Sequence, residues 1–347
     1  MSEKIINSNS NEFALFKDIE FFNNITKDSY AYGGVDNTFS IFESIDNIIY
    51  LIYANEKLSI ICYDLIKDQK INEIKKAHKK YITNFTYNID EKNKRDLILS
   101  ISFDDNNIKL WKVKDFECLL NIEHANDYGY LYSACFLSDS NQLYIISSNF
   151  GYSNELEPIK VFNIIGNKIK EINELKENVM YINSYYDKFL SINYIITGNN
   201  GYIISYNYSS NQLYHKYCNN DNRGHFSIII ININEEIKLI ESSCDGSIRI
   251  WDFHSGILLK KVKASNSGLN GISLWNEDFL FIGCDDKYIK ILDLKKMVII
   301  KSLIGHNNEV ITIKKIIHPL FGECMISQGL EKDQIKLWVN KKTFNFN

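Results

Sequence analysis

Arginine and proline are nearly absent from this chain of 347 residues. Arginine occurs only at Arg95, Arg223 and Arg249, and the formal net charge is −4 at pH 7. Proteins that read phosphate or guanine depend heavily on the arginine guanidinium and on an excess of positive charge, so nucleic acid is not an expected partner. Proline occurs only at Pro158 and Pro319, and no linker divides the chain, which favours a single domain.

Paired cysteines and long apolar runs are also missing. The seven cysteines are widely spaced and form no C-x-x-C pair, which is typical of reduced intracellular thiols and not of disulfides or a zinc site. They are Cys62, Cys118, Cys135, Cys218, Cys244, Cys284 and Cys324. No apolar run approaches about 18 residues, so no transmembrane segment is predicted. Residues 1–4 are not typical of a signal peptide, and we expect an intracellular protein, cytoplasmic, nuclear or both.

What the chain does contain is a strand ending that recurs seven times. Its clearest copies lie at residues 105–111, 245–252 and 334–338, and each includes a tryptophan. The seven anchor residues are 41 to 51 positions apart. They are Tyr63, Trp111, Phe162, Tyr206, Trp251, Leu292 and Trp338. A period of about 40–50 residues is the signature of a repeat array, so the sequence predicts seven similar units.

Each unit has the pattern of four strands. In the fifth unit, apolar residues alternate or run together over 227–233, 237–243, 247–253 and 257–262, with turn signals such as Asp245-Gly246 between them. No stretch shows a sustained helical period. Four antiparallel strands per unit make one propeller blade, so the sequence predicts an all-β, seven-bladed propeller. We place the blades at about 38–76, 82–122, 130–175, 179–218, 225–263, 269–303 and 309–347 of a single domain, 1–347.

The seventh unit lacks its fourth strand, because only nine residues follow Trp338. Residues 11–33 are rich in apolar side chains, and we expect this N-terminal segment to supply the strand and close the ring without an open edge. A rival interpretation makes residues 36–42 part of an additional blade, since their spacing from aspartate to aromatic matches the repeats. Phe42 lies only 21 residues before Tyr63, too few for four strands, so we assign 38–43 to the first strand of blade one.

Three marks make these repeats similar to those of the WD-repeat propellers, over essentially the whole chain. They are a Trp-Asp ending, a Gly-His pair before a first strand, and an aspartate six residues before the anchor. These marks stand at Trp251-Asp252, at Gly224-His225 and Gly305-His306, and at Asp105, Asp245 and Asp286.

The resemblance implies a chain of hydrogen bonds inside a blade, formed by a His, a Ser or Thr, an Asp and a Trp. By position this quartet would be His78, Ser100, Asp105 and Trp111 in blade two, and His225, Ser243, Asp245 and Trp251 in blade five. Blade seven offers His306, Ser327 and Trp338, with its turn acid out of step at 331–333. The other four blades lack the tryptophan and resemble decayed repeats.

A His, Ser and Asp that recur together are also the residues of a hydrolase triad. Repetition in several blades favours a structural role instead, since such a chain satisfies polar groups that are costly to bury. No P-loop, nucleophile elbow or zinc-protease motif occurs, so we predict no catalytic residues. The histidines have no paired spacing, and the acids beside Cys244 and Cys284 coincide with blade turns. Neither a metal nor another cofactor is expected.

One face of such a ring is the candidate binding surface. It is built from the loops between a fourth and a following first strand and from the turns between second and third strands. By position, the residues directed toward its central mouth are Asp104, Asn199, Cys244, Asp285, Glu309 and Tyr81. Three of these are acidic, which favours a peptide that bears Lys or Arg; the alternative is a merely hydrated acidic rim.

The sequence therefore predicts a non-enzymatic scaffold or adaptor that presents peptide-binding faces within a larger complex. Two alternatives stay open. A phosphoinositide-binding propeller could use the basic run at 75–80, but the paired arginines of such propellers are absent, so lipid binding is not expected. A substrate receptor of a ubiquitin ligase often carries Trp-Asp-x-Arg, where this chain has His254 in place of the arginine.

Overall fold

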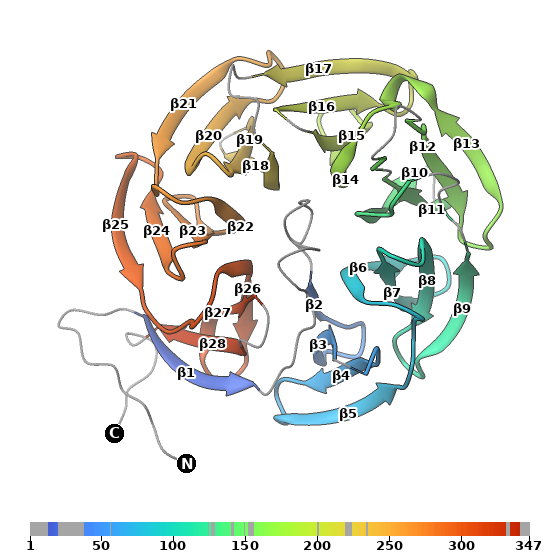
Figure 1. Ribbon diagram of the computed structural model, residues 1–347, viewed down its shortest axis with the longest axis horizontal. Helices are drawn as coiled ribbons and strands as arrows, with labels where there is room; N and C mark the ends of the chain where they lie inside the picture. The colour runs from blue at the N-terminus through green and yellow to red at the C-terminus, as the bar shows by residue number, and fades with distance from the viewer. Residues whose placement is uncertain are drawn as a thin grey trace.

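Seven four-stranded sheets surround a central axis (Figure 1). The computed structural model describes residues 13–19, 38–55, 57–123, 125, 129–139, 142–148, 150–151, 156–199, 201–218, 224–233, 235–330 and 334–340. In these residues one short 3-10 helix, η1 (Asn173–Leu175), accompanies the strands. The predicted all-β, seven-bladed propeller is confirmed.

Six blades are built from four consecutive strands, in order from the inner strand at the axis to the outer strand at the rim (Figure 1). Blade one contains β2 (Phe39–Glu43), β3 (Ile49–Ala54), β4 (Ile60–Asp64) and β5 (Gln69–Ile74). Blade two contains β6 (Ile82–Asp90), β7 (Arg95–Ser102), β8 (Asn107–Lys112) and β9 (Glu117–Ile122). Blade three contains β10 (Ala134–Asp139), β11 (Gln142–Ser147), β12 (Ile159–Asn163) and β13 (Lys168–Ile172).

The same order continues through blades four to six. Blade four contains β14 (Val179–Asp187), β15 (Ile192–Asn199), β16 (Tyr202–Asn207) and β17 (Gln212–Cys218). Blade five contains β18 (His225–Ile233), β19 (Glu236–Ser243), β20 (Ser247–Asp252) and β21 (Leu258–Lys263). Blade six contains β22 (Leu269–Asn276), β23 (Phe279–Cys284), β24 (Ile289–Asp293) and β25 (Val298–Leu303).

Blade seven joins the two ends of the chain. Its first three strands are β26 (Val310–His318), β27 (Gly322–Gly329) and β28 (Ile335–Asn340), and its outer strand is β1 (Phe13–Ile19). β1 runs antiparallel to β28, with Phe13 opposite Asn340 and Ile19 opposite Ile335. The predicted closure by an N-terminal strand is confirmed, and it comes from residues 13–19 of the expected 11–33; residues 20–33 lie outside the described part.

A polar seam crosses the junction of blades seven and one at the inner strands. The hydroxyl of Thr38 lies 3.0 Å from that of Thr312 and donates to Oε1 of Gln328 at 2.6 Å. All three side chains are buried. Buried polar groups of this kind are stable only when they are satisfied, so the seam fixes how the first and last blades meet.

Each blade buries both of its faces against neighbours, as β7 illustrates. Successive side chains of a strand point to opposite faces of a sheet. Leu97 and Leu99 therefore pack with Phe136 of blade three, whereas Ile98 packs with Ile52 of blade one. Two buried faces explain why the middle strands are nearly continuous apolar runs instead of alternating ones.

The outer strands end this pattern. β21 carries Lys260, Lys261 and Lys263, and most of its side chains are exposed. A free strand edge can pair with another chain, and lysines on the edge oppose that pairing. The lysines of this outer strand therefore oppose edge-to-edge pairing with another chain. Among the seven outer strands, β1 alone comes from the opposite end of the chain to the rest of its blade.

We predict that deleting residues 1–19 lowers the free energy of unfolding by at least about 3 kcal/mol, because each lost backbone hydrogen bond of the β1–β28 pair is worth about 1 kcal/mol. Urea unfolding followed by circular dichroism measures the change. Deleting residues 341–347 is the matched control, since it leaves all of the described strands intact. Equal stability of the two truncated chains would contradict closure by β1.

Candidate functional site

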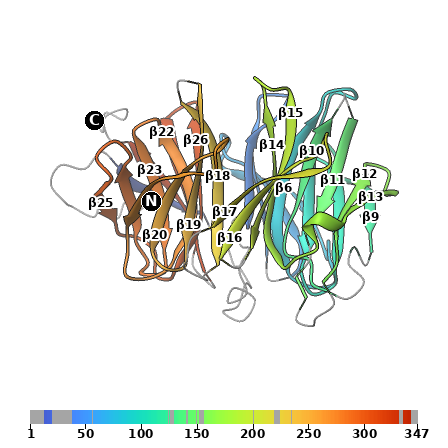
Figure 2. The ribbon, with the colours of Figure 1, turned by 90° about the horizontal axis from the view of Figure 1, so that it is seen from above.

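The ring presents two faces of turns, seen edge-on in Figure 2. We call upper the face that carries the turns between second and third strands, such as 103–106 and 285–288. Loops from an outer strand to the next inner strand, such as 75–81, reach the same face. Turns between first and second strands, such as 44–48, lie on the opposite, lower face because the strands of a blade alternate in direction.

In blade two the structure brings His78, Ser100 and Trp111 together. Nε2 of His78 lies 2.7 Å from Oγ of Ser100, and the indole N–H of Trp111 donates to the same oxygen at 2.8 Å. All three side chains are buried. One hydroxyl thus links the loop that enters the blade to its second and third strands.

Asp105, the fourth member of the expected quartet, is not bonded directly to the histidine. Its Oδ1 lies 4.0 Å from Nδ1 of His78, while its Oδ2 accepts the backbone N–H of Lys79 at 3.1 Å. Burial, and to a smaller extent the charge of Lys109, lowers the pKa of His78 to about 3. The imidazole is therefore neutral near pH 7, and Asp105 holds the loop by its backbone.

Blade seven repeats this arrangement. Nε2 of His306 lies 2.6 Å from Oγ of Ser327, and Trp338 donates its indole N–H to that oxygen at 2.7 Å. Ser327 has no exposed surface. The turn at 331–333, where the sequence places the displaced acid, lies outside the described residues.

Blade five differs. The indole N–H of Trp251 has no hydrogen-bond partner in the described part of the chain, and the side chain of His225 is not among the described ones. Ser243 accepts the backbone N–H of Asp245 at 3.4 Å. Oδ2 of Asp245 instead accepts from Nη2 of Arg249 at 2.5 Å. The turn acid of this blade is thus held by a guanidinium.

Arg249 is buried and also meets Glu241, its partner across β19 and β20, at 3.3 Å. Burial opposes the ionised carboxylate of Asp245, but the N–H of Ser247 and the charge of Arg249 outweigh it, so the pKa of Asp245 is lowered. Hydrogen bonds between charged partners are stronger than neutral ones, which explains why Asp245 turns to the arginine. The signal in the sequence is a pair of opposite charges inside two apolar strands.

The residues predicted to line the mouth of the upper face differ in access. Asp104 and Tyr81 are exposed, whereas Cys244, Asp285 and Glu309 are half-buried. Asn199 is only 2% exposed, and its amide donates to Oε2 of Glu177 at 3.2 Å. Asn199 therefore makes a contact within its own blade and is too buried to meet a partner.

Sequence reasoning missed an aromatic cluster on this face. It joins Phe103, in the turn before β8, to Tyr130, Tyr132 and Phe150 of blade three. Phe103 and Tyr130 are stacked, with ring centroids 4.7 Å apart and planes 8° apart. The only signals in the sequence are an aromatic residue beside Asp104 and the long stretch between the second and third strands of blade three.

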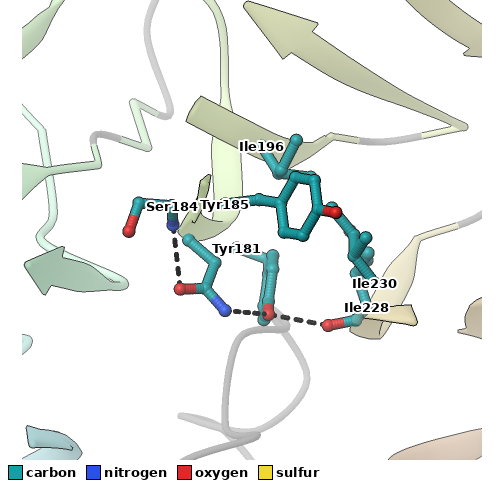
Figure 3. Close-up of a pocket in the computed structure, with 7 residues that line it drawn as sticks. Tyr181, Ser184, Tyr185, Ile196, Ile228 and Ile230 are labelled. Carbon is teal, nitrogen blue, oxygen red and sulfur yellow. Dashed lines mark hydrogen bonds between the residues drawn. The ribbon is translucent and has the colours of Figure 1, made fainter. Parts of the chain in front are cut away.

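A small cleft opens between blades four and five (Figure 3). Its volume is about 110 Å³, and it lies between the inner strands β14 and β18. The phenol of Tyr181 donates to the carbonyl of Ile228 at 2.8 Å and accepts from the amide of Asn183 at 3.1 Å. Ser184 donates to the carbonyl of Phe136 at 2.7 Å, so blade four is pinned to both neighbours.

The described residues contain no group of three or more His, Cys, Asp or Glu side chains placed to hold a metal ion. None of the seven cysteines forms a disulfide bond within these residues. None of the helices in the described ranges has the length and apolar character needed to cross a membrane.

We predict that Ser100→Ala lowers the free energy of unfolding by about 2–4 kcal/mol, because it leaves the N–H of Trp111 and a ring nitrogen of His78 buried without a partner. Ser102→Ala is the matched control: it lies on the same strand, is equally buried, and its hydroxyl has no hydrogen-bond partner in the described part. Urea unfolding should show a much smaller loss for the control. Similar losses would mean that the Ser100 hydroxyl contributes nothing special.

We also predict an acid-sensitive step in stability. An unfolded histidine has a pKa of about 6.5, whereas the pKa of folded His78 is about 3. The stabilisation is complete above about pH 6.5 and is lost as the pH falls toward 3, by roughly 2–3 kcal/mol at about pH 4.5. In urea titrations His78→Asn, although less stable at pH 7, should lose less stability between pH 6.5 and 4.5. An unchanged pH slope would contradict the neutral, buried imidazole.

Comparison with known proteins gives short local similarities, and no protein-family model matches the chain. It is 30% identical over 84 residues to the U3 small nucleolar RNA-associated protein 21 homolog of Schizosaccharomyces pombe, covering 24% of this chain and 9% of that protein. It is 27% identical over 108 residues to the probable coatomer subunit beta′ of the same organism, covering 30% and 13%. Over 73 residues it is 27% identical to myosin heavy chain kinase C of Dictyostelium discoideum, covering 21% and 9%. The chain thus matches about a tenth of the length of these relatives and is similar to parts of larger proteins.

Proposed function

We propose that this chain is a divergent WD-repeat propeller that acts as a non-enzymatic scaffold and presents its upper face to partner proteins. The observation that carries the proposal is what the His and Ser residues bind. In blades two and seven the serine hydroxyl is hydrogen-bonded to the histidine and to a tryptophan inside the blade, where all three side chains are buried. These residues serve the fold and leave recognition to the turns.

Their geometry argues against hydrolysis. Ser100 and Ser327 have no exposed surface, and each hydroxyl already meets an indole and an imidazole. A nucleophilic serine has to reach the substrate and have its proton removed by the histidine. The pKa of His78 is too low for a good base near pH 7, since the best catalytic pKa lies close to the working pH.

The acidic residues of the upper face favour a cationic ligand. Asp104 is exposed, and Asp285 and Glu309 are half-buried on the same face. Asp285 accepts the amide N–H of Asn270 at 2.8 Å, which orients its carboxylate. Turns on a closed ring lose little freedom when a partner docks, so a peptide that bears Lys or Arg could bind them with little ordering cost. Nucleic acid and lipid headgroups need positive surfaces and fit these three acidic positions poorly.

The relatives support a role in an assembly. One is described as a coatomer subunit and another as associated with a small nucleolar RNA. We carry over to this chain only the membership of a multiprotein complex. Cysteines that form no disulfide suit a reducing compartment, so we place this role in the cytoplasm, the nucleus or both.

We predict that Asp104→Lys combined with Asp285→Lys weakens the binding of cationic peptides about ten-fold or more, because two attractive charges become repulsive. Fluorescence anisotropy can measure this with labelled degenerate peptide pools that carry a central Lys, Arg or Glu. Asp46→Lys combined with Glu91→Lys is the control, with the same charge change on exposed residues of the lower face. If Lys and Arg pools bind no better than Glu pools, the upper face is not a cation-binding surface.

A further inference from the structure

The aromatic cluster joins two blades at the upper face. Phe103 belongs to the turn of blade two, and the ring that stacks on it, Tyr130, belongs to the entry of blade three. Tyr132 meets Phe103 edge to face at 4.7 Å, and Phe150 lies 4.8 Å from Tyr132. Phe103, Tyr130 and Phe150 are only half-buried, so part of this cluster reaches the surface.

Hydrogen bonds hold the cluster in place. Tyr130 and Phe150 exchange both backbone hydrogen bonds, at 2.9 and 3.0 Å. The amide of Asn106 donates to the carbonyl of Gly129 at 2.6 Å, which ties the turn of blade two to the loop of blade three. The rings are thus ordered before any ligand arrives, which removes much of the entropic cost of binding.

Blade three is enlarged at this point. β11 ends at Ser147 and β12 begins at Ile159, whereas in blade four β15 ends at Asn199 and β16 already begins at Tyr202. Glu157 closes the base of the long connection, with a buried ion pair to Lys160 at 2.8 Å and a bond from the N–H of Gly129 at 3.2 Å. Connections longer than the fold requires commonly serve binding.

An exposed carboxylate lies in the same turn as Phe103. Asp104 follows Phe103, is exposed, and forms no ion pair within the described residues. The basic run at 75–80, in the loop between blades one and two, also meets this turn, because Asp105 accepts the backbone N–H of Lys79. The side chain of Lys79 lies 4.0 Å from Glu123, and Lys109 donates to the carbonyl of Ala77. The aromatic rings and the carboxylate of Asp104 both attract a cation.

We propose that Phe103, Tyr130 and Asp104 form the anchor point for a Lys or Arg side chain of a partner peptide. The rings hold the cationic head over their faces and Asp104 pairs with it. This inference rests on the proposed function, and it selects the junction of blades two and three from the whole upper face. Asp285 on blade six then has a secondary part in the same surface.

The test uses the full chain and the same Lys-, Arg- and Glu-centred peptide pools in anisotropy titrations. Phe103→Leu keeps an apolar side chain but removes the ring, and Asp104→Asn keeps the shape but removes the charge. Each substitution should weaken the binding of the Lys and Arg pools about five-fold. Phe103→Tyr, which keeps an aromatic ring, should bind them as the unmodified chain does. The matched controls are an exposed acid and an exposed ring in turns of the lower face. Asp46→Asn and Phe189→Leu should change affinity two-fold or less.

The outcomes separate the two proposals. If Lys and Arg pools bind preferentially but Phe103→Leu and Asp104→Asn keep their affinity, the anchor is wrong while the cation-binding face stands. If the lower-face variants weaken binding as much as the blade-two variants, the loss is not specific to this junction and the anchor is wrong. If no cationic pool is preferred over the Glu pool, the proposed function fails and the anchor with it. Thermal unfolding of each variant shows that a loss of binding is not a loss of fold, and Asp104→Asn, at an exposed position, keeps the test valid if Phe103→Leu is destabilised.

Discussion

Every blade of this protein depends on packing against two neighbours. The middle strands send alternate side chains into two different cores, as Leu97 and Ile98 do, so a single blade exposes both of its apolar faces to water. Such a chain becomes stable only when the circle is complete. The pairing of β1 with β28 and the polar seam at Thr38 close the circle at the one junction where the chain is not continuous. The stiffness that a binding face requires follows from this closure.

The blades satisfy their buried polar groups with two kinds of network. Blades two and seven use a neutral histidine, a serine and a tryptophan, and blade five uses a buried arginine between two acids. Each tethers strands or loops of its blade through buried polar groups that are otherwise costly to bury. A charged network and a neutral one can therefore occupy equivalent places in different repeats. Blade five shows that the fold is kept where this part of the repeat signature has changed.

Most of the fold could be predicted from the sequence, because seven copies of an Ile-rich third strand at a steady period are compatible with few folds other than a propeller. Closure by a strand from residues 11–33 was also predictable, since blade seven lacked a strand and this segment was apolar, but the bounds of the strand, 13–19, were not. The site was harder to predict. Asn199 occupies a mouth position by its number, but it is buried and its amide donates to Glu177, a contact that no spacing reveals. The stack of Phe103 on Tyr130 joins residues of two blades, and such contacts depend on the angle between blades.

We propose that partner proteins are recognised on the upper face, at the junction of blades two and three. Site-specific photo-crosslinking in the native cell tests this most directly, with a photoreactive phenylalanine analogue in place of Phe103, which keeps a ring there, and, for comparison, at position 46 on the lower face. We predict a discrete cross-linked protein from position 103, with its attachment site next to a Lys or Arg, and little product from position 46. Cross-links from position 46 alone would contradict it.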